Sequence, residues 1–224
     1  MREIVLDTET TGLDPFNGDR IVEIGCVELD NHVPTGRTYQ VYLNPEREMT
    51  DEVIAVHGLT NDFLSDKPKF KEIAPEFLNF IGEDSKLVIH NAAFDIKFLN
   101  AELEWAGFKT LSFDRVIDTL IIARQKFPGS RVNLNELCKR FDISLECRSL
   151  HGALLDSQLL TQVYIELLGG AQPNLVLSEK KQEKQDVITE TVHVMHASRS
   201  FPVSEEELKK HAEFVGKIKN NLWN

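Results

Sequence analysis

Residues 3–12 read Glu3-Ile4-Val5-Leu6-Asp7-Thr8-Glu9-Thr10-Thr11-Gly12, an apolar run that ends in two acidic side chains. Alternate residues of a β-strand point to the same face, so the run predicts a strand that directs Asp7 and Glu9 to one side. Two ionised carboxylates that close repel each other and resist dehydration. The pattern therefore favours a strand end where divalent cations neutralise both groups, whereas an isolated Asp-x-Glu would by default indicate a polar turn.

The composition describes one good-sized domain with an appendage. The chain has 224 residues, of which 42% are hydrophobic and 27% charged. No apolar run reaches the length of a transmembrane helix, and the N-terminus enters a strand without a signal segment, so we expect a cytoplasmic protein with no membrane partner. The three cysteines, Cys26, Cys138 and Cys147, lack paired metal-ligand spacing and indicate reduced thiols rather than a zinc site.

The net charge of −11 argues against a broad nucleic-acid surface. Affinity for a long phosphate backbone comes mainly from Lys and Arg that displace counterions. The objection weakens for a protein that binds only a few nucleotides at a chain end. Bound metals would then supply local positive charge, and a partner would hold the rest of the nucleic acid.

The pattern along the chain predicts a sheet covered by helices. Two further strands are expected over Arg20–Leu29 and Arg37–Leu43, joined by a turn over Asp30–Gly36 as an antiparallel meander. Beyond them we expect helices over Lys69–Ile81, Ala92–Ala106, Thr119–Lys126, Asn133–Phe141 and Leu154–Leu168, with short strands over Lys86–Ile89 and at Val116-Ile117.

The compact domain is expected to span residues 1–170 and to end near Gly169-Gly170. Residues 171–186 are polar and read as a flexible linker. We expect residues 187–224 to form a tail with an extended stretch and then a short helix from Ser204 to Lys219. Ser204 and Glu207 have the spacing of a capping box. The apolar stripe of that helix is Leu208, Ala212, Val215 and Ile218, with Phe201, Leu222 and Trp223 beside it.

Two more acidic residues rise from apolar helical stripes. Asp95 follows the expected N-cap Asn91 and shares a face with Phe98 and Leu99. Asp156 stands in the same relation to Leu159 and Leu160. Taken alone, Asp95 is equally explained as a first-turn acid favoured by the helix dipole.

His151 precedes Asp156 by five residues, which is about 140° of rotation on a continuous helix. The two would not share a helix face, so we place His151 in a loop ended by Gly152, from which it reaches the same site. An imidazole beside a carboxylate cluster suits a general base. Four carboxylates with two hard cations are a recurring apparatus for phosphodiester cleavage.

Three strings carry a family resemblance: Asp7-Thr8-Glu9-Thr10-Thr11-Gly12, His90-Asn91-Ala92-Ala93-Phe94-Asp95 and His151-Gly152-Ala153-Leu154-Leu155-Asp156. In this order and spacing they resemble the three exonuclease motifs of the DEDDh (DnaQ-like) 3′→5′ exonucleases. The resemblance runs from about Arg2 to Gly170. It includes Val56-His57-Gly58-Leu59-Thr60 and the turn Phe127-Pro128-Gly129.

The resemblance implies an α/β, RNase H-like fold with a mixed five-stranded sheet, helices on both faces and a flexible C-terminal tail. It also implies two divalent metal ions, Mg²⁺ or Mn²⁺. Asp7, Glu9 and Asp156 would hold one ion, Asp7 would bridge to the second, and Asp95 would support that second ion. His151 would be the general base. Substrate contacts would come from Asp7, Glu9, Asp156, Glu52, His57, Thr10, Leu13, Asn91 and Phe94. For His57 the alternative is that it closes the turn at Gly58.

The tail also matches the layout of this family. Gln172-Pro173-Asn174-Leu175-Val176-Leu177 resembles the Gln-x-x-Leu peptides that dock on the sliding clamp, although it ends in Leu, and a plain linker is the alternative. Residues 187–224 correspond to the part that binds the polymerase alpha subunit. A small theta-type subunit is a further candidate partner. The terminal helix would otherwise fold back on the domain or form a homodimer.

The resulting prediction is a 3′→5′ exonuclease that removes mispaired nucleotides from DNA primer ends as part of a bacterial replicase. Selectivity would come from fraying, because a mismatch frees the terminal nucleotides from the stack at less cost. Two other functions stay open. One is a DEDDh exonuclease that acts on RNA ends, and the other is a non-catalytic adaptor with the same fold.

Overall fold

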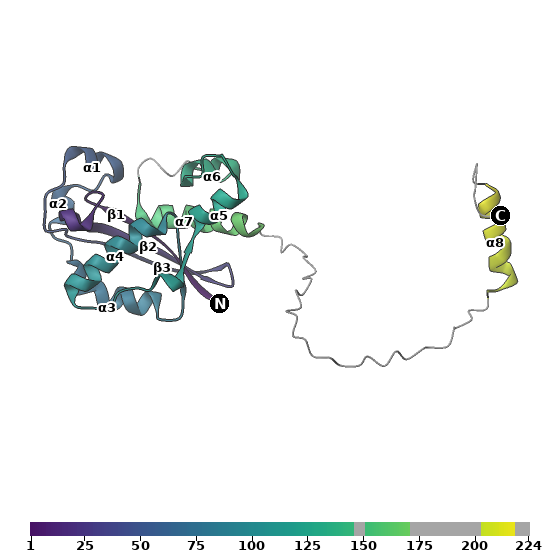
Figure 1. The fold of residues 1–224 in the computed structure, drawn as a ribbon, viewed down its shortest axis with the longest axis horizontal. Coiled ribbons are helices and arrows are strands. Elements are labelled where there is room, and N and C mark those ends of the chain that lie inside the picture. The colour runs from purple at the N-terminus through teal and green to yellow at the C-terminus, as the bar shows by residue number, and fades with distance from the viewer. Residues whose placement is uncertain (146–150, 171–202, 218–224) are drawn as a thin grey trace, which may run out of the picture. The chain divides into compact units, whose positions relative to one another are not determined.

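The computed structural model describes residues 1–145, 151–170 and 203–217 (Figure 1). The chain divides into two units, Met1–Leu175 and Val176–Asn224, and each is described by itself. The predicted linker 171–186, its clamp-binding peptide, the extended stretch of the tail and Cys147 lie outside the described residues.

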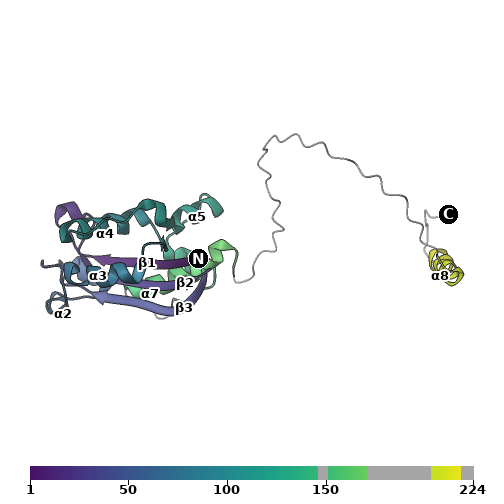
Figure 2. The same cartoon turned by 90° about the horizontal axis from the view of Figure 1, so that it is seen from below.

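A five-stranded mixed sheet forms the centre of the first unit. Its strands are β1 (Arg2–Thr10), β2 (Ile21–Asp30), β3 (Val33–Tyr42), β4 (Lys86–Ile89) and β5 (Val116–Asp118), in the order β3-β2-β1-β4-β5. The meander of β1, β2 and β3 is antiparallel, and its strands lie side by side (Figure 2). Strand β4 is parallel to β1, and β5 is parallel to β4. The predicted mixed five-stranded sheet is therefore confirmed.

The hairpin between β2 and β3 is tighter than predicted. The expected turn over Asp30–Gly36 shrinks to Asn31 and His32, and β3 already begins at Val33. Both turn residues have positive φ, 49° and 66°, as a two-residue hairpin with type I′ geometry requires. Pro34 fits within β3 because this is an edge strand, where a missing N–H leaves no partner unsatisfied.

All five helices that the sequence predicts in the first unit are present, with nearly the predicted bounds. They are α3 (Phe70–Ile81), α4 (Ala92–Ala106), α5 (Thr119–Lys126), α6 (Leu134–Arg140) and α7 (Ala153–Leu168). The sequence analysis missed α1 (Asp51–His57), α2 (Asn61–Leu64) and the 3₁₀ turns η1 (Pro15–Asn17) and η2 (Phe113–Arg115). At seven residues or fewer, these elements are too short to show an apolar period. Among the helices of the described ranges, none combines the length and apolar character that a bilayer span requires.

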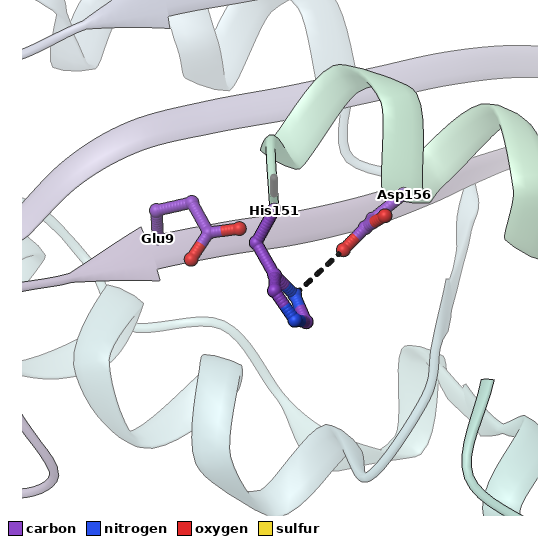
Figure 3. A group of neighbouring side chains, drawn as sticks. All are labelled: Glu9, His151 and Asp156. Atoms are coloured by element: carbon purple, nitrogen blue, oxygen red, sulfur yellow. Dashed lines mark ion pairs between the residues drawn. The ribbon is translucent and has the colours of Figure 1, made fainter. Parts of the chain in front are cut away.

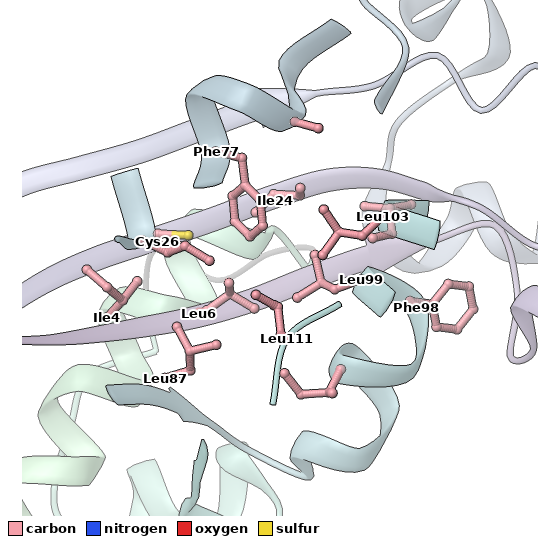
Figure 4. Packing of buried hydrophobic residues seen from close by; sticks show 14 of the residues in the cluster. Ile4, Leu6, Ile24, Cys26, Phe77, Leu87, Phe98, Leu99, Leu103 and Leu111 are labelled. Carbon is pink, nitrogen blue, oxygen red and sulfur yellow. The ribbon is translucent and has the colours of Figure 1, made fainter. Parts of the chain in front are cut away.

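Strand β1 is buried on both faces, because its side chains alternate between two cores. Ile4 and Leu6 pack into the core that holds Phe77 of α3 and Phe98 of α4 (Figure 4). Val5 points the other way, into the core that holds Leu160 and Tyr164 of α7. Helices therefore cover both faces of the sheet, as predicted.

The second unit contains helix α8 (Glu205–Gly216). Ser204 Oγ accepts a hydrogen bond from Glu207 N, and the Glu207 side chain accepts one from Ser204 N, so the predicted capping box is confirmed. Leu208 and Phe214 are exposed on this helix. Residues 218 and 219 of the predicted helix lie outside the described residues.

The N-terminus of α7 lies directly on β2, and Gly25 permits this approach. A Cβ atom at Gly25 would lie 2.1 Å from Leu154 N. Ser157 Oγ donates to Gly25 O at 2.9 Å, which holds the two elements together one turn further along. Because the obstructing atoms are backbone, no rotamer change relieves such a clash.

Gly25→Ala should therefore destabilise the protein by about 1–3 kcal/mol or more, because α7 must shift away from β2. Chemical denaturation followed by circular dichroism measures the change. Gly152→Ala is the matched control, since its Cβ would meet only Glu23 Oε2 at 4.0 Å. Equal stability of Gly25→Ala and wild type would contradict the close packing.

Candidate active site

One cavity of about 220 Å³ is lined by the predicted catalytic residues. It lies where the carboxyl ends of β1 and β4 meet the first turns of α4 and α7. The residues that line it are Asp7, Thr8, Glu9, His90, Asn91, Phe94, Asp95, Leu134, His151, Asp156 and Leu160. All five predicted catalytic residues are therefore brought together, along with Asn91 and Phe94.

Asp7 and Glu9 share a face of β1, as the strand period predicts. In the antiparallel pair with β2 they stand opposite Gly25 and Glu23. They lie two and four residues after Val5, so they point to the same face of the sheet as Val5, which packs against α7. Asp156 comes to them from the first turn of α7, buried to 3% exposure.

Asp95 reaches the site from the opposite face of the sheet. It lies in the first turn of α4 and is buried to 3% exposure. Its Oδ1 accepts hydrogen bonds from Thr8 N at 3.1 Å and from Thr8 Oγ1 at 2.7 Å. Thr8, which the sequence analysis did not single out, therefore anchors this carboxylate to the end of β1.

Asn91 is the N-cap residue of α4, as predicted, and has φ 66°. Its side chain, however, makes no capping bond. Asp118 replaces it, accepting from Asn91 N at 3.1 Å and Ala92 N at 3.2 Å. Asp118 also caps its own helix α5 through Leu120 N at 2.8 Å. The capping of α5 joins neighbouring residues and can be predicted from the sequence. The hydrogen bonds from Asp118 to the start of α4 depend on the pairing of β4 with β5.

His151 occupies the loop before α7, as predicted. Helix α7 begins at Ala153 with Gly152 as N-cap. The His151 backbone N–H donates to Val56 O of α1 at 3.2 Å. Its Nδ1 lies 3.2 Å from Asp156 Oδ2, and Figure 3 shows the ring beside that carboxylate. The side chain is 47% exposed, so the imidazole faces solvent as well as the site.

A fifth carboxylate, Glu23, holds the start of α7. It is buried, and its Oε2 accepts from Ala153 N at 3.1 Å while Oε1 accepts from Gln40 Nε2 at 2.8 Å. Gly152 has no side chain to cap α7, and Glu23 supplies the acceptor from β2. The sequence analysis missed Glu23, because its partner is 130 residues away.

The donor atoms suit a divalent cation. The ligand atoms of Glu9, His151 and Asp156 all lie within 4.8 Å of one another (Figure 3). Carboxylate oxygens are the ligands that Mg²⁺ and Mn²⁺ prefer, whereas imidazole is more typical of zinc. This group differs from the predicted ligand set, which has Asp7 and Asp95 and excludes His151. Asp7 and Asp95 line the same cavity, so the oxygen-rich set is present.

The environment of Asp95 also favours a nearby cation. Burial raises the pKa of Asp95 to about 7, against the opposing effect of the hydrogen bonds from Thr8. At neutral pH this carboxyl is therefore partly protonated. A cation beside it would stabilise the ionised form and lower that pKa.

The remaining predicted substrate contacts are Thr10, Leu13, Glu52 and His57, and none is among the residues that line the cavity. Thr10 Oγ1 donates to Gly12 O at 2.6 Å. Leu13 is 82% exposed after β1, and Glu52 is exposed in the first turn of α1.

His57 is buried at the end of α1, and burial lowers its pKa, so the ring is neutral near pH 7. Its Nδ1 accepts from Leu59 N at 3.0 Å, which leaves the proton on Nε2. That Nε2 has no hydrogen-bond partner among the described residues.

His90 also lines the cavity, although the sequence analysis assigned no role to it. Its Nδ1 lies 2.9 Å from Thr119 Oγ1, and burial lowers its pKa. His90 is thus a neutral part of the wall. Its position beside Asn91 in the second motif is the sequence feature that could have indicated this place in the cavity.

Comparisons with known proteins agree with this geometry. A family model for exonucleases, RNase T, matches residues 4–164. The DNA polymerase III epsilon subunit of Rickettsia felis is 50% identical over 223 residues, 97% of each chain. That of Escherichia coli K12 is 41% identical over 220 residues, 94% of this chain and 90% of the relative.

The chain belongs to the epsilon-subunit family of DNA polymerase III. It is accordingly a DEDDh 3′→5′ exonuclease, as the three motifs indicated. The RNase H-like fold is also seen in the solved nuclease domain of 3′hExo, a DEDDh family member bound to rAMP. That structure has a TM-score of 0.63 at 22% identity and covers 75% of this chain and 91% of its own. Divalent metal ions are implied for the epsilon family by this fold.

The pKa of Asp95 predicts a pH-dependent stability. This pKa is about 7 in the folded state and 3.8 in a model peptide, so ionisation of Asp95 destabilises the metal-free protein increasingly from pH 4 to pH 7. Asp95→Asn should then be more stable than wild type at pH 8, by at most about 4 kcal/mol, and nearly equal at pH 4. Denaturation with a chelator present at both pH values measures this.

The control for this comparison is Asp84→Asn, which changes an exposed carboxylate outside the cavity. It should show no such pH-dependent gain. A constant difference between Asp95→Asn and wild type at both pH values would contradict the raised pKa.

Proposed function

We propose that this protein removes mispaired 3′-terminal nucleotides from DNA as the proofreading exonuclease of a bacterial replicative polymerase. The observation that carries the proposal is the convergence of Asp7, Glu9, Asp95, Asp156 and His151 on one cavity. The relatives named DNA polymerase III subunit epsilon support the replicative role, since they match the chain over nearly its whole length. A replicase subunit of this kind would work in the cytoplasm.

We assign two divalent cations, Mg²⁺ or Mn²⁺, to this cavity. Asp7, Glu9 and Asp156 would hold one, Asp7 would bridge to the other, and Asp95 would support the second. When bound, such ions activate water and neutralise the charge that develops on the phosphate oxygens. The high pKa of Asp95 supports its role, because the carboxyl gains most from a cation that keeps it ionised.

His151 would act as the general base. The contact of Nδ1 with Asp156 Oδ2 at 3.2 Å favours the tautomer with its proton on Nδ1. The lone pair on Nε2 then accepts the proton of the attacking water. Glu23 and Val56 O support this role indirectly, since they hold the backbone of residues 151–153 in place.

The terminal nucleotide would lie against Asn91 and Phe94, which line the cavity. His57 would contribute its buried N–H at Nε2, which has no other partner among the described residues. Glu52, Thr10 and Leu13 would contact the nucleotide from the periphery. Mispaired ends would enter more often because they are already unstacked.

Digestion of labelled primers tests the activity. With Mg²⁺ the protein should shorten 3′ ends, and a chelator should stop it. A mispair saves on the order of 1–2 kcal/mol of stacking and pairing, so mispaired primers should be shortened roughly tenfold faster than paired ones. RNA primers of the same sequence separate the DNA from the RNA substrate. Equal rates on paired and mispaired DNA would argue against proofreading.

Asp7→Ala should stay folded and lose activity by at least about 10²-fold, because the cations lose their bridging ligand. It should also lose the increase in melting temperature that Mg²⁺ gives the wild type. Asp84→Asn is again the control and should keep both. Near-normal turnover by Asp7→Ala would refute the metal assignment.

The residues after Gly170 would connect the exonuclease to its partners. We assign residues 187–224 to the polymerase alpha subunit, and residues 172–177 to the sliding clamp. A small theta-type subunit is a third proposed partner, and residues 1–170 would be the exonuclease domain. Exposed Leu208 and Phe214 on α8 support an interaction surface, since apolar side chains on a short helix gain stability from a partner.

Deletion of all residues after Gly170 should preserve the cleavage of single strands but abolish co-purification with the polymerase alpha subunit. The physical reason is that the catalytic cavity draws only on residues before the deletion. Co-purification of tagged full-length and shortened chains with the alpha subunit measures the difference. Unchanged co-purification would assign the tail another role.

A further inference from the structure

Helices α5 and α6, with the turn between them, carry an unusual local charge. Residues 119–140 contain five basic side chains and one acidic one, Glu136, whereas the whole chain has a net charge of −11. All five basic residues are exposed. We call them the basic surface: Arg124, Lys126, Arg131, Lys139 and Arg140.

Four of these charges have no carboxylate partner among the described residues, and three of the four also lack an aromatic partner there. Lys139 pairs with Glu136 at 3.0 Å, and the Arg140 guanidinium lies 4.4 Å from the centroid of the Phe127 ring. Arg124, Lys126 and Arg131 form no ion pair with any described residue. Basic residues that do pair with carboxylates elsewhere in the first unit are Arg2, Arg20, Arg37, Arg47, Lys67, Lys69 and Lys97.

The basic surface begins at the wall of the catalytic cavity. Leu134, the first residue of α6, lines that cavity, as does His90. The His90 ring is held by Thr119 of α5 and by the backbone of Val132. The charge of Arg124 is close enough to affect His90. Both α5 and α6 also pack against α7, which carries Asp156 (Figure 1).

Another side of the site has the opposite charge. Helix α1 contacts His151 through Val56 O, and its first turn carries the exposed residues Asp51 and Glu52. Phosphates that approach over this turn would meet like charge. The α5–α6 side would attract phosphates instead, because its exposed cations, which lack ion pairs with the described carboxylates, can displace counterions from a nucleic-acid backbone.

We propose that the basic surface binds the phosphates of the DNA strand whose 3′ end lies in the cavity, through Arg124, Lys126 and Arg131. This inference rests on the proposed function, and it names the surface that positions the strand. It also explains how a chain of net charge −11 binds DNA, since the positive charge is concentrated beside the cavity.

The test compares two triple variants with the same change in net charge. The first is Arg124→Gln, Lys126→Gln and Arg131→Gln. The control is Lys71→Gln, Lys86→Gln and Lys109→Gln, which alters three residues that do not line the cavity. Fluorescence anisotropy with a labelled single-stranded DNA oligonucleotide and a chelator gives the dissociation constant at several salt concentrations without cleavage.

The first variant should bind about tenfold more weakly near 0.1 M salt. The slope of log affinity against log salt should fall by about 2, since each lost phosphate contact on single-stranded DNA removes roughly 0.7. The control should keep the wild-type slope. Equal slopes for the two variants would overturn the proposal, because the effect would then be one of net charge.

A second measurement separates this proposal from the proposed function. Thymidine 5′-monophosphate p-nitrophenyl ester carries one phosphate and has no upstream strand. The ratio of kcat/KM for the oligonucleotide to kcat/KM for this ester should fall about tenfold in the first variant, and an equal loss on both substrates would refute a role in strand binding. Wild-type protein that cleaves neither substrate would refute the nuclease function, while the salt slopes would still decide on the basic surface.

Discussion

The burial of β1 on both faces is the constraint on which the site depends. A strand enclosed by two cores has no solvent-exposed side, so polar side chains at its carboxyl end need partners on both faces. Because successive side chains of a strand point to opposite faces, Asp7 and Glu9 point toward α7, and Thr8 points toward α4. The two helices then bring Asp156 and Asp95 to the same strand end from opposite sides.

Gathering carboxylates at this point costs stability in the metal-free protein. Burial raises the pKa of Asp95 to about 7, even though Thr8 donates two hydrogen bonds to it. Such a site favours cation binding, because a bound cation offsets both the repulsion between the carboxylates and the cost of removing them from water. Functional sites commonly store such unfavourable electrostatics, and here the rigid sheet holds the groups together.

The active site also depends on a fixed position of α7 against the sheet. Close backbone packing at Gly25, the capping of Ala153 N by Glu23 and the bond from His151 N to Val56 O all act within a few residues of His151. None of these contacts involves a group that we assign to the chemistry. They determine where the imidazole and Asp156 stand relative to Glu9, and so they link the core of the sheet to the geometry of the base.

The sequence by itself determined the strand that carries Asp7 and Glu9, the helices that carry Asp95 and Asp156, and the loop position of His151. Periods of 2 and 3.6 residues encode these features locally, and the family motifs added the roles. Only the tertiary structure decided that Asp118 caps α4, that Thr8 anchors Asp95 and that Glu23 holds α7. Each of these contacts joins residues 26 to 130 positions apart. Local periodicity reports which face a side chain occupies, but strand pairing and helix packing decide which distant group it meets.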